Sequence, residues 1–396
     1  EQYITRWMSR NNIRGASLAV MKDEQLIYCK GFGWADKEQQ VTADVGHIYR
    51  IASASKLITA VGIMKLCDQG RLTLDSKVFG PEGILNQFTE IKDKRSEQIT
   101  VRHLLNHTSG LAPGIYVPSF VKRYEKWGDT AKMNLRDSLV SYLALDAVRN
   151  TRPGEKMRYS CLNFITLQAI IERVSGERLD HFAARNVFEP LGLKNTWYNP
   201  IDEREKPFAM DAPIVPTSVE GGHLLKGEVH DPTARIVNRG VSGNAGLYST
   251  AEDLAVVASM LMNGGKYSTP REGLLGKLGF KQSKQLYSHH CVDTFFELTD
   301  ECQEHGRTLG WDTGSFGDLD DYRRYEIFGG ISSNGEVAKM KAIVEEAQKL
   351  GYTVLITADH GNADQMTETK KGKTSVRTAH SLNPVPFIIY DNAKVW

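Results

Sequence analysis

The sequence predicts a mixed α/β fold of the α+β kind, and three observations support it. Residues 16–34 form two apolar runs of strand length around a polar turn at Lys22-Asp23-Glu24. Several later stretches repeat apolar residues at helical spacing. Near the end of the sequence an amphipathic helix is followed by a buried strand, a combination typical of α/β sheets. With 396 residues the chain can bury a large core, and its length allows two or three domains.

The composition is ordinary for a soluble globular protein, with 41% hydrophobic and 24% charged residues. The formal net charge of +1 predicts no broad attraction to nucleic acid or to an anionic membrane. No apolar run is long enough to form a transmembrane segment. The polar opening from Glu1 to Arg6 predicts a helix rather than a secretion signal. Because signals are removed from mature proteins, this leaves the compartment open.

Three longer helices are expected in the first 263 residues. The first lies within 51–70, where apolar residues recur at i, i+4 and i+7 before a terminating glycine. The second covers 161–175 and is also followed by glycine, and the third covers 250–263 with two acidic residues in its first turn. The stretches 112–150 and 200–245 are rich in proline, glycine and charge, which predicts loops and short helices at a substrate rim.

The last part of the sequence has a different character. Residues 312–330 are acidic, then basic, with little apolar content, and could form a linker. Residues 335–350 have the pattern of an amphipathic helix that ends at Gly351. Residues 352–357 follow as a buried strand, so we expect a helix–strand unit of the parallel α/β type.

Ser53-Ala54-Ser55-Lys56 is the first motif that carries chemistry, because it matches the pattern S-x-x-K. Residues three apart lie on one face of a helix, so the lysine amine is expected beside the serine hydroxyl. The helix N-terminus also favours negative charge at that serine. Lys56 could take the Ser53 proton directly, or it could keep a second base deprotonated.

The motif alone leaves a structural interpretation open, in which Ser53 is an ordinary N-cap serine. The chain contains a second copy at Ser119-Phe120-Val121-Lys122. Ser53 begins a long apolar helix directly after a strand pair, whereas Ser119 is expected in a loop region. This context favours Ser53 as the nucleophile.

Tyr159 stands just before the predicted helix 161–175. A tyrosine can serve as a general base when cations such as Lys56 stabilise its ionised form. The alternative is a packed aromatic side chain without a catalytic role.

Residues 1 to about 312 resemble the serine hydrolases that include class C β-lactamases, penicillin-binding proteins and β-lactamase-like esterases. The matching blocks, in order, are IASASKLITAVGIMKL, ITVRHLLNHTSGL, PGEKMRYSCLNF, GEVHDPTA and GNAGLYSTAEDLA. The resemblance implies a β-lactamase/transpeptidase-like fold, with an antiparallel sheet flanked by helices plus a helical domain. It also implies Ser53, Lys56 and Tyr159 as catalytic residues, with the backbone N–H of Ser53 in the oxyanion hole.

The resemblance divides the chain into two expected parts. A hydrolase spans 1–320, with its α/β part at about 1–50 and 240–320 and its helical part at about 51–239. A separate segment is expected over 330–396. Candidate substrate-binding residues are Cys161, Asn163, Gly329 and Gly330.

The sequence departs from the family pattern at two places. The tyrosine motif of the β-lactamases reads Tyr-x-Asn, but Cys161 stands at the third position and cannot supply an amide donor and acceptor. The third motif, Lys-Thr-Gly or His-Thr-Gly, is expected near residue 330, yet residues 326–330 contain no Lys, His or Thr. Lys373-Thr374-Ser375 resembles that motif in letters, and we interpret it as coincidence.

Residues 335–390 resemble the C-terminal end of cofactor-independent phosphoglycerate mutase, through VLITADHGNADQM and RTAHSLNPVPFIIY. In that family Asp359, His360 and His380 would be metal ligands. The mutase's nucleophile segment and its D-x-x-x-H ligand pair have no counterpart here. We therefore expect a chimeric, non-catalytic C-terminus and no metal or other cofactor.

The predicted function is hydrolysis of an ester or amide, of the β-lactam or peptidoglycan type, through an acyl-Ser53 intermediate. The expected partner is a small or cell-wall-derived acyl substrate, with no nucleic acid, and the expected location is extracytoplasmic. One alternative is a catalytically impaired binding module that acylates without turnover. A second is a metal-dependent phosphoryl-transfer fragment based on the tail. The oligomeric state cannot be predicted.

A few other residues invite a functional interpretation. His107 and the Glu228/His230/Asp231 cluster fit no common metal motif, and we expect them in loop structure. Trp311 matches a family position near the active site and could equally be core. The five cysteines are scattered and are expected as free thiols, with a Cys291–Cys302 disulfide possible in an exported protein.

Overall fold

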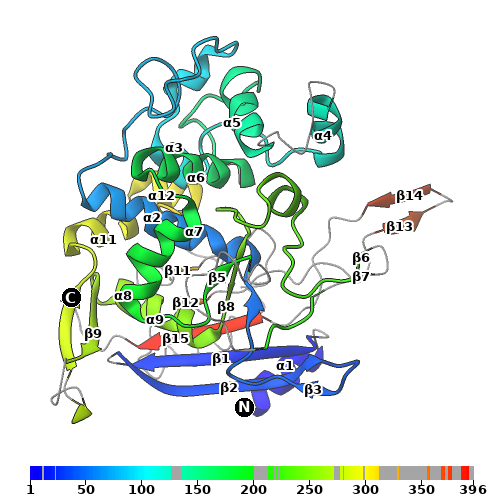
Figure 1. Ribbon diagram of the computed structural model, residues 1–396, viewed down its shortest axis with the longest axis vertical. Helices are drawn as coiled ribbons and strands as arrows, with labels where there is room; N and C mark the ends of the chain where they lie inside the picture. Colours follow the sequence, from blue (N-terminus) through cyan, green and yellow to red (C-terminus); the bar gives the residue numbers. More distant parts are fainter. Residues whose placement is uncertain are drawn as a thin grey trace.

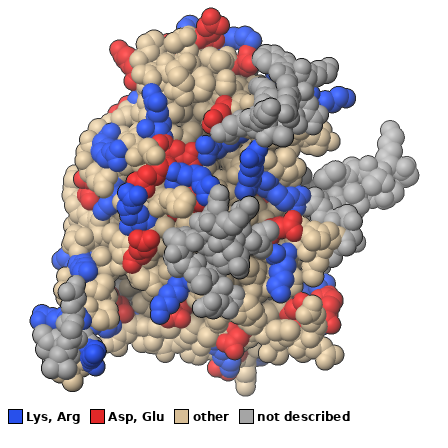
Figure 2. Space-filling view, viewed as in Figure 1, with Lys and Arg blue, Asp and Glu red and all other residues tan. Residues whose placement is uncertain are grey.

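The computed structural model describes most of the first 311 residues and five strands after residue 327. The described ranges are 1–10, 13–22, 24–125, 135–199, 213–217, 219–220, 223–271, 277–279, 281–297 and 299–311, with 328–329, 355–356, 367–370, 373–376 and 385–391. No helix in these ranges is long and apolar enough to cross a membrane. Positive and negative side chains are interspersed over the face seen in Figure 2, in keeping with the near-zero net charge.

The main sheet is built on the predicted N-terminal strand pair. β1 (Gly15–Lys22) and β2 (Gln25–Asp36) form an antiparallel hairpin, and β3 (Val41–Thr42) pairs with the far end of β2. Gly15 lies where an added Cβ would meet the carbonyl oxygen of Trp34 at 2.1 Å, so only glycine fits this crossing. The strand prediction for 16–34 is confirmed.

The other edge of β1 pairs with a strand from the far end of the sequence. β15 (Val385–Asp391) runs parallel to β1, with Ala16 opposite Val385 and Lys22 opposite Asp391. The strand order is therefore β15-β1-β2-β3, and helix α9 (Ala251–Met262) packs against both β1 and β15. The tail strand is part of the main sheet, as Figure 1 shows.

Helix α2 (Ser55–Asp68) lies at the centre of the helical layer, above the sheet in Figure 1. It is buried on nearly all sides, as expected for a helix that is apolar all round. It packs against α6 (Cys161–Ser175), α7 (Leu179–Ala183) and α11 (His289–Phe296). Gly62 allows the close approach of α6, since a Cβ there would lie 3.0 Å from the Ile171 side chain. One continuous core cluster thus joins both layers to the helix that follows Ser53.

The remaining helices of the described ranges are α1 (Gln2–Arg10), η1 (Ala52–Ala54), η2 (Lys94–Gln98), α3 (Val101–Leu105), α4 (Val117–Glu125), α5 (Leu135–Leu145), η3 (Ala184–Phe188), α8 (Glu189–Leu191), η4 (Thr233–Val237) and α12 (Asp300–His305). The remaining strands before residue 312 are β4 (Tyr49–Arg50), β5 (Trp197–Tyr198), β6 (Val219–Glu220), β7 (His223–Leu224), β8 (Leu247–Ser249), β9 (Lys266–Pro270) and β10 (Lys281–Gln285).

The predicted helices agree closely with α2, α6 and α9. Helix α6 begins after Ser160, whose hydroxyl accepts the Leu162 N–H, and ends at Gly176 with φ 78°. Helix α9 begins after Thr250, which caps it in the same way. One expectation was wrong, because Ser119 lies in helix α4 rather than in a loop.

In the described part of the tail beyond residue 327 there are four further short strands. β11 (Phe328–Gly329) and β12 (Leu355–Ile356) pair in parallel, in agreement with a strand near 352–357. β13 (Thr367–Lys370) and β14 (Lys373–Val376) form a separate hairpin that projects from the body in Figure 1. Lys373-Thr374-Ser375 lies in that hairpin, outside the main sheet, in keeping with coincidence. The predicted helix 335–350 lies outside the described residues.

Candidate active site

Ser53 lies in a tight turn between a short strand and the central helix. Strand β4 pairs with β8, and the Ile51 N–H donates to the Leu247 carbonyl at 3.1 Å. Ala52 then has φ 36°, a left-handed value that costs a non-glycine residue about 1–3 kcal/mol. The N-cap of α2 is Ala54, without a side-chain cap. Ser53 is therefore not the N-cap serine of the structural interpretation.

Lys56 lies one turn along, with its amine beside Ser53. Its Nζ donates to Ser53 Oγ at 3.1 Å and to the Asn244 carbonyl at 2.8 Å. The same nitrogen lies 5.0 Å from the ring centroid of Tyr159 and 5.9 Å from that of Phe164. Only 4% of Lys56 is exposed, so these contacts replace its hydration.

The surroundings of Lys56 favour its charged form. Burial alone would lower the pKa of the ammonium, but the ionised forms of Cys161 and Tyr159 and the Asp231 carboxylate outweigh it and raise the pKa above its ordinary value. An ammonium has three donors and no acceptor, which matches its two donated bonds. The contacts of Lys56 therefore suit its ammonium form.

Tyr159 completes the group around Ser53, as the resemblance implied. Its hydroxyl donates to Ser53 Oγ at 3.1 Å. A hydroxyl can rotate and also accept, so the same contact offers a path for the Ser53 proton. The Tyr159 side chain is partly exposed, and so is Ser53. Both can therefore be reached from solvent.

The buried side chain of His107 packs against the ring of Tyr159. The two rings stack with centroids 4.5 Å apart. His107 Nδ1 accepts the Ser160 N–H at 3.0 Å, and its carbonyl accepts the Arg158 N–H at 2.8 Å, so both ends of the 158–160 segment are held. Burial, with Arg307 and Lys56 nearby, lowers the pKa of His107 well below its ordinary value. Sequence interpretation placed His107 in loop structure and missed this role.

A buried loop over 241–247 supplies the carbonyl that Lys56 contacts. Three side chains of α2 hold this loop by hydrogen bonds. Ser55 Oγ accepts the Leu247 N–H at 2.9 Å, and Thr59 Oγ1 donates to the Gly243 carbonyl at 2.8 Å. The third is Lys56, through its contact with the Asn244 carbonyl. An added Cβ at Gly243 would lie 2.7 Å from a carbonyl oxygen of α6. The loop is thus fixed between α2 and α6.

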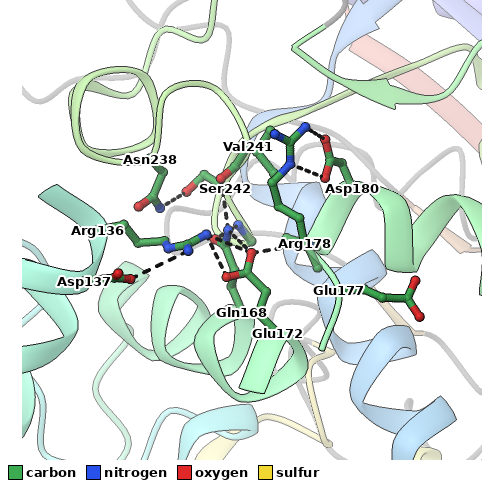
Figure 3. A network of polar contacts seen from close by, with 12 residues as sticks. Arg136, Asp137, Gln168, Glu172, Glu177, Arg178, Asp180, Asn238, Val241 and Ser242 are labelled. Atoms are coloured by element: carbon green, nitrogen blue, oxygen red, sulfur yellow. Dashed lines mark hydrogen bonds and ion pairs between the residues drawn. The ribbon is translucent and has the colours of Figure 1, made fainter. Parts of the chain in front are cut away.

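Gln168 holds this loop from the α6 side (Figure 3). Its Nε2 donates to the Val241 carbonyl at 3.1 Å, and its Oε1 accepts the Gly243 N–H at 3.0 Å. Nε2 also donates to Glu172 at 3.1 Å, and Glu172 pairs with Arg136 at 2.7 Å. Burial raises the pKa of Glu172 despite that cation. Sequence interpretation did not single out Gln168, because only tertiary packing brings it to the loop.

Arg307 approaches the Tyr159 ring as a second cation. Its guanidinium carbon lies 5.2 Å from the ring centroid, and 7% of the residue is exposed. It was not singled out in the sequence, although it stands two residues before the block Leu309-Gly310-Trp311. Trp311 itself is 2% exposed and packs on Phe296 with centroids 4.8 Å apart, so it is a core residue.

The candidate substrate-binding residues have different outcomes. Cys161 begins helix α6 and is partly exposed. Asn163 was expected to contact substrate, but it is fully buried, with its amide bonded to Ser109 at 2.6 Å and to His107 Nδ1 at 3.1 Å. It orients His107 instead. Gly329 lies in β11, and Gly330 lies outside the described residues.

The metal alternative gains no support from the described residues. Among them, no group of three His, Cys, Asp or Glu side chains is placed to hold a metal ion. Asp359, His360 and His380 lie outside the described residues. Asp231 Oδ1 accepts the Ala234 N–H at 2.7 Å, which confirms its expected role in loop structure.

The five cysteines, Cys291 and Cys302 among them, are free thiols as expected.

The family model described as Beta-lactamase matches residues 1–368. This match extends past the boundary predicted near residue 320. A protein of Escherichia coli strain K12 named "Putative D-alanyl-D-alanine carboxypeptidase" is 31% identical over 333 residues, which cover 77% of this chain and 70% of that protein.

Solved structures show the same fold. The D-amino acid amidase of Ochrobactrum anthropi matches with a TM-score of 0.52 and 20% identity, over 75% of this chain and 73% of that one. EstCE1, described as a hydrolase with promiscuous acyltransferase activity, matches with a TM-score of 0.54 and 22% identity, over 79% of this chain and 80% of that one. The predicted α+β architecture is confirmed.

Proposed function

Since the chain belongs to the Beta-lactamase family and is a serine hydrolase acting on amide or ester substrates, we propose that Ser53 is its nucleophile and that its substrates are D-amino-acid peptides of the peptidoglycan type. One observation carries the assignment of the nucleophile. Ser53 Oγ lies 3.1 Å from both Lys56 Nζ and the Tyr159 hydroxyl, at a partly exposed position. The substrate class is suggested by the name of the Escherichia coli relative.

Tyr159 is the general base in this proposal, because Lys56 already carries its proton. The phenolate form of Tyr159 takes the Ser53 proton while Ser53 Oγ attacks the carbonyl carbon. The protonated Tyr159 then gives this proton to the leaving amine or alcohol, which leaves an acyl-Ser53 ester. Water attacks that ester and loses a proton to Tyr159, and Tyr159 passes this proton to Ser53 Oγ as the bond between Ser53 and the acyl group breaks and the acid is released.

Lys56 acts as an electrostatic residue in both steps. Its ammonium faces the Tyr159 ring and donates to Ser53 Oγ, so it stabilises negative charge on either oxygen. The Asn244 carbonyl fixes its position from the other side. The backbone N–H of Ser53 remains the predicted donor to the oxyanion.

Intact-protein mass spectrometry tests the nucleophile. The chain is incubated with a β-lactam or with an activated p-nitrophenyl ester, and the same is done with Ser53→Ala and Ser119→Ala. Ser119 belongs to the second S-x-x-K copy and is exposed on α4, so its variant is a matched control. We expect a covalent adduct in the wild type and in Ser119→Ala, and none in Ser53→Ala. An adduct that persists in Ser53→Ala would falsify the proposal.

The decay of that adduct separates the hydrolase from the binding module. Release of D-alanine from a D-alanyl-D-alanine peptide, with repeated turnovers per chain, is the expected result. A permanent adduct without turnover would support the impaired module, which the family relatives do not favour. From the same relatives we also propose an extracytoplasmic location. Fractionation of cells that express the native gene tests this location.

A further inference from the structure

A largely buried carboxylate, that of Glu172, joins three helices beside the 241–247 loop (Figure 3). Nη1 of Arg136, on α5, lies 2.8 Å and 2.7 Å from the two Glu172 carboxylate oxygens. Two further donors reach Glu172 Oε1 at 3.1 Å, namely the Leu179 N–H at the start of α7 and Nε2 of Gln168. The Glu172 and Arg136 side chains are 14% and 21% exposed. Donors from three helices therefore fix the position of this carboxylate.

The orientation of the Gln168 amide decides whether it can hold the loop. Its Oε1 accepts the Gly243 N–H, and its Nε2 donates to the Val241 carbonyl. Half a turn of the amide would place its NH₂ group against the Gly243 N–H and its oxygen against the Val241 carbonyl. Because Gln168 is fully buried, the turned amide would leave these groups unpaired, which is costly.

Glu172 favours the orientation that holds the loop. An ionised carboxylate accepts hydrogen bonds and cannot donate, so it attracts Gln168 Nε2 and repels Gln168 Oε1. The two residues lie one helical turn apart on α6, where side chains at this spacing are neighbours. Arg136 holds the carboxylate from the opposite helix, and this ion pair keeps the charge favourable in its buried setting.

The loop connects this network to the reacting serine. Gly243 is followed by Asn244, whose carbonyl accepts a hydrogen bond from Lys56 Nζ at 2.8 Å. The same nitrogen donates to Ser53 Oγ at 3.1 Å. A shift of the loop therefore moves one of the two acceptors that orient the Lys56 ammonium. Small errors in the position of such a group slow a reaction markedly.

We propose that Glu172, held by Arg136, is a positioning residue for the reaction at Ser53. It fixes the Gln168 amide, and through the 241–247 loop it sets the place of Lys56. This rests on the proposed function, in which Lys56 stabilises negative charge at Ser53. Glu172 acts through Gln168 and lies outside the group of side chains that contact Ser53 Oγ.

The first test is Glu172→Gln, assayed on a neutral p-nitrophenyl ester after circular dichroism has shown that the variant is folded. The new amide can present either its oxygen or its NH₂ group, so it no longer selects one orientation of Gln168. We expect kcat to fall about 3–10-fold, the effect of about one hydrogen bond, with KM unchanged because Lys56 acts in both steps. Glu177→Gln is the matched control, since Glu177 follows the same helix and pairs with Arg185 at 2.9 Å. Its kcat should equal that of the wild type.

The second test asks whether the effect passes through Gln168. Glu172→Gln is also made in the Gln168→Leu variant, where we expect no further loss of kcat. If Gln168→Leu fails to fold, Arg136→Lys is compared with Arg136→Met instead. Arg136→Lys keeps a cation beside Glu172 and should retain most of the wild-type kcat, whereas Arg136→Met should show the 3–10-fold loss.

Three results would overturn the role of Glu172. The first is a wild-type kcat in folded Glu172→Gln, or a change confined to KM. The second is an equal loss with and without the Gln168 side chain, which would mean that Glu172 acts by another route. The third is an equal loss in Arg136→Lys and Arg136→Met, as a packing defect would cause.

Lys56→Met separates failure of this proposal from failure of the proposed function. Full activity in Lys56→Met would remove the electrostatic role of Lys56 and the premise together. A strongly impaired Lys56→Met, alongside a wild-type kcat in Glu172→Gln, would leave the role of Lys56 in place and overturn only that of Glu172.

Discussion

The His107 imidazole stacks on the Tyr159 ring with centroids 4.5 Å apart and planes inclined by 29°. His107 itself takes a left-handed backbone conformation, with φ 61°. Its Nδ1 accepts the N–H of Ser160, the residue after Tyr159. A single buried histidine therefore fixes both the ring and the backbone of the proposed base, and it does so only while Nδ1 is unprotonated.

Acid is expected to destabilise the fold through His107. The folded state holds the pKa of His107 well below 6.5, so below about pH 6.5 the unfolded chain binds a proton that the folded chain excludes. The free energy of unfolding falls from that pH downward, towards the folded pKa, by about 1.4 kcal/mol per pH unit. Urea unfolding of the wild type and His107→Gln between pH 7.5 and 5 measures this.

The slope against pH is expected to be shallower in His107→Gln. His290→Gln, at an exposed position, controls for loss of an imidazole elsewhere. Equal slopes in the wild type and His107→Gln would show that His107 is protonated in the folded state.

Lys56→Met is expected to slow acylation of Ser53 by about 10²–10⁴-fold, the usual range for a group that assists proton transfer. The variant removes the cation that faces Tyr159 and Ser53 Oγ. Stopped-flow release of p-nitrophenol measures the acylation step. Lys65→Met is a close control, because Lys65 lies on the same helix, donates to the Leu286 carbonyl at 2.8 Å and lies 5.2 Å from the Tyr287 ring centroid. Similar losses in both variants would point to helix damage.

Gln168→Leu is expected to lower the free energy of unfolding by about 2–5 kcal/mol, because it leaves a buried N–H of Gly243 and a buried carbonyl of Val241 unpaired. Activity should fall as well, since the loop carries the carbonyl that positions Lys56. Urea unfolding with parallel ester assays provides both measurements. Gln69→Leu, at the exposed end of α2, should change neither. A stable Gln168→Leu variant with normal kcat would show that the 241–247 loop keeps its conformation without the Gln168 hydrogen bonds.

Cys161→Asn is expected to raise β-lactam hydrolysis by about 3–10-fold, the gain from one neutral hydrogen bond to the substrate amide. Cys161 begins α6 two residues after Tyr159 and is partly exposed. Hydrolysis of nitrocefin, compared with that of a p-nitrophenyl ester, is the measurement, and Cys161→Ala is the control. Equal gains on both substrates would mean that the change acts on the catalytic groups instead.

The sequence predicted local structure well because the signals for it are local. Helix α6 could be bounded to the residue from its apolar spacing, the serine before it and Gly176 after it. The pairing of Ser53 with Lys56 follows from their spacing on consecutive helical turns. Tyr159 was placed by family resemblance, since nothing in its own neighbourhood brings it to Ser53.

The rest of the site depends on packing between distant segments. Arg307, His107 and Gln168 each reach the site through contacts between segments far apart in the sequence, and their neighbours in the sequence do not predict those contacts. Asn163 shows the opposite error, because its place next to the tyrosine motif suggested substrate contact. Burial of α6 turns that side chain towards Ser109 instead.

The pairing of β1 with β15 has a consequence for biosynthesis. While the chain leaves the ribosome, β1 and β2 can form their hairpin early, but the second edge of β1 stays open until residue 391 has been made. An open strand edge readily recruits other strands, and slow long-range pairing prolongs that exposure. The open edge of β1 in the nascent protein therefore needs protection, either by a chaperone or by rapid synthesis and pairing of β15.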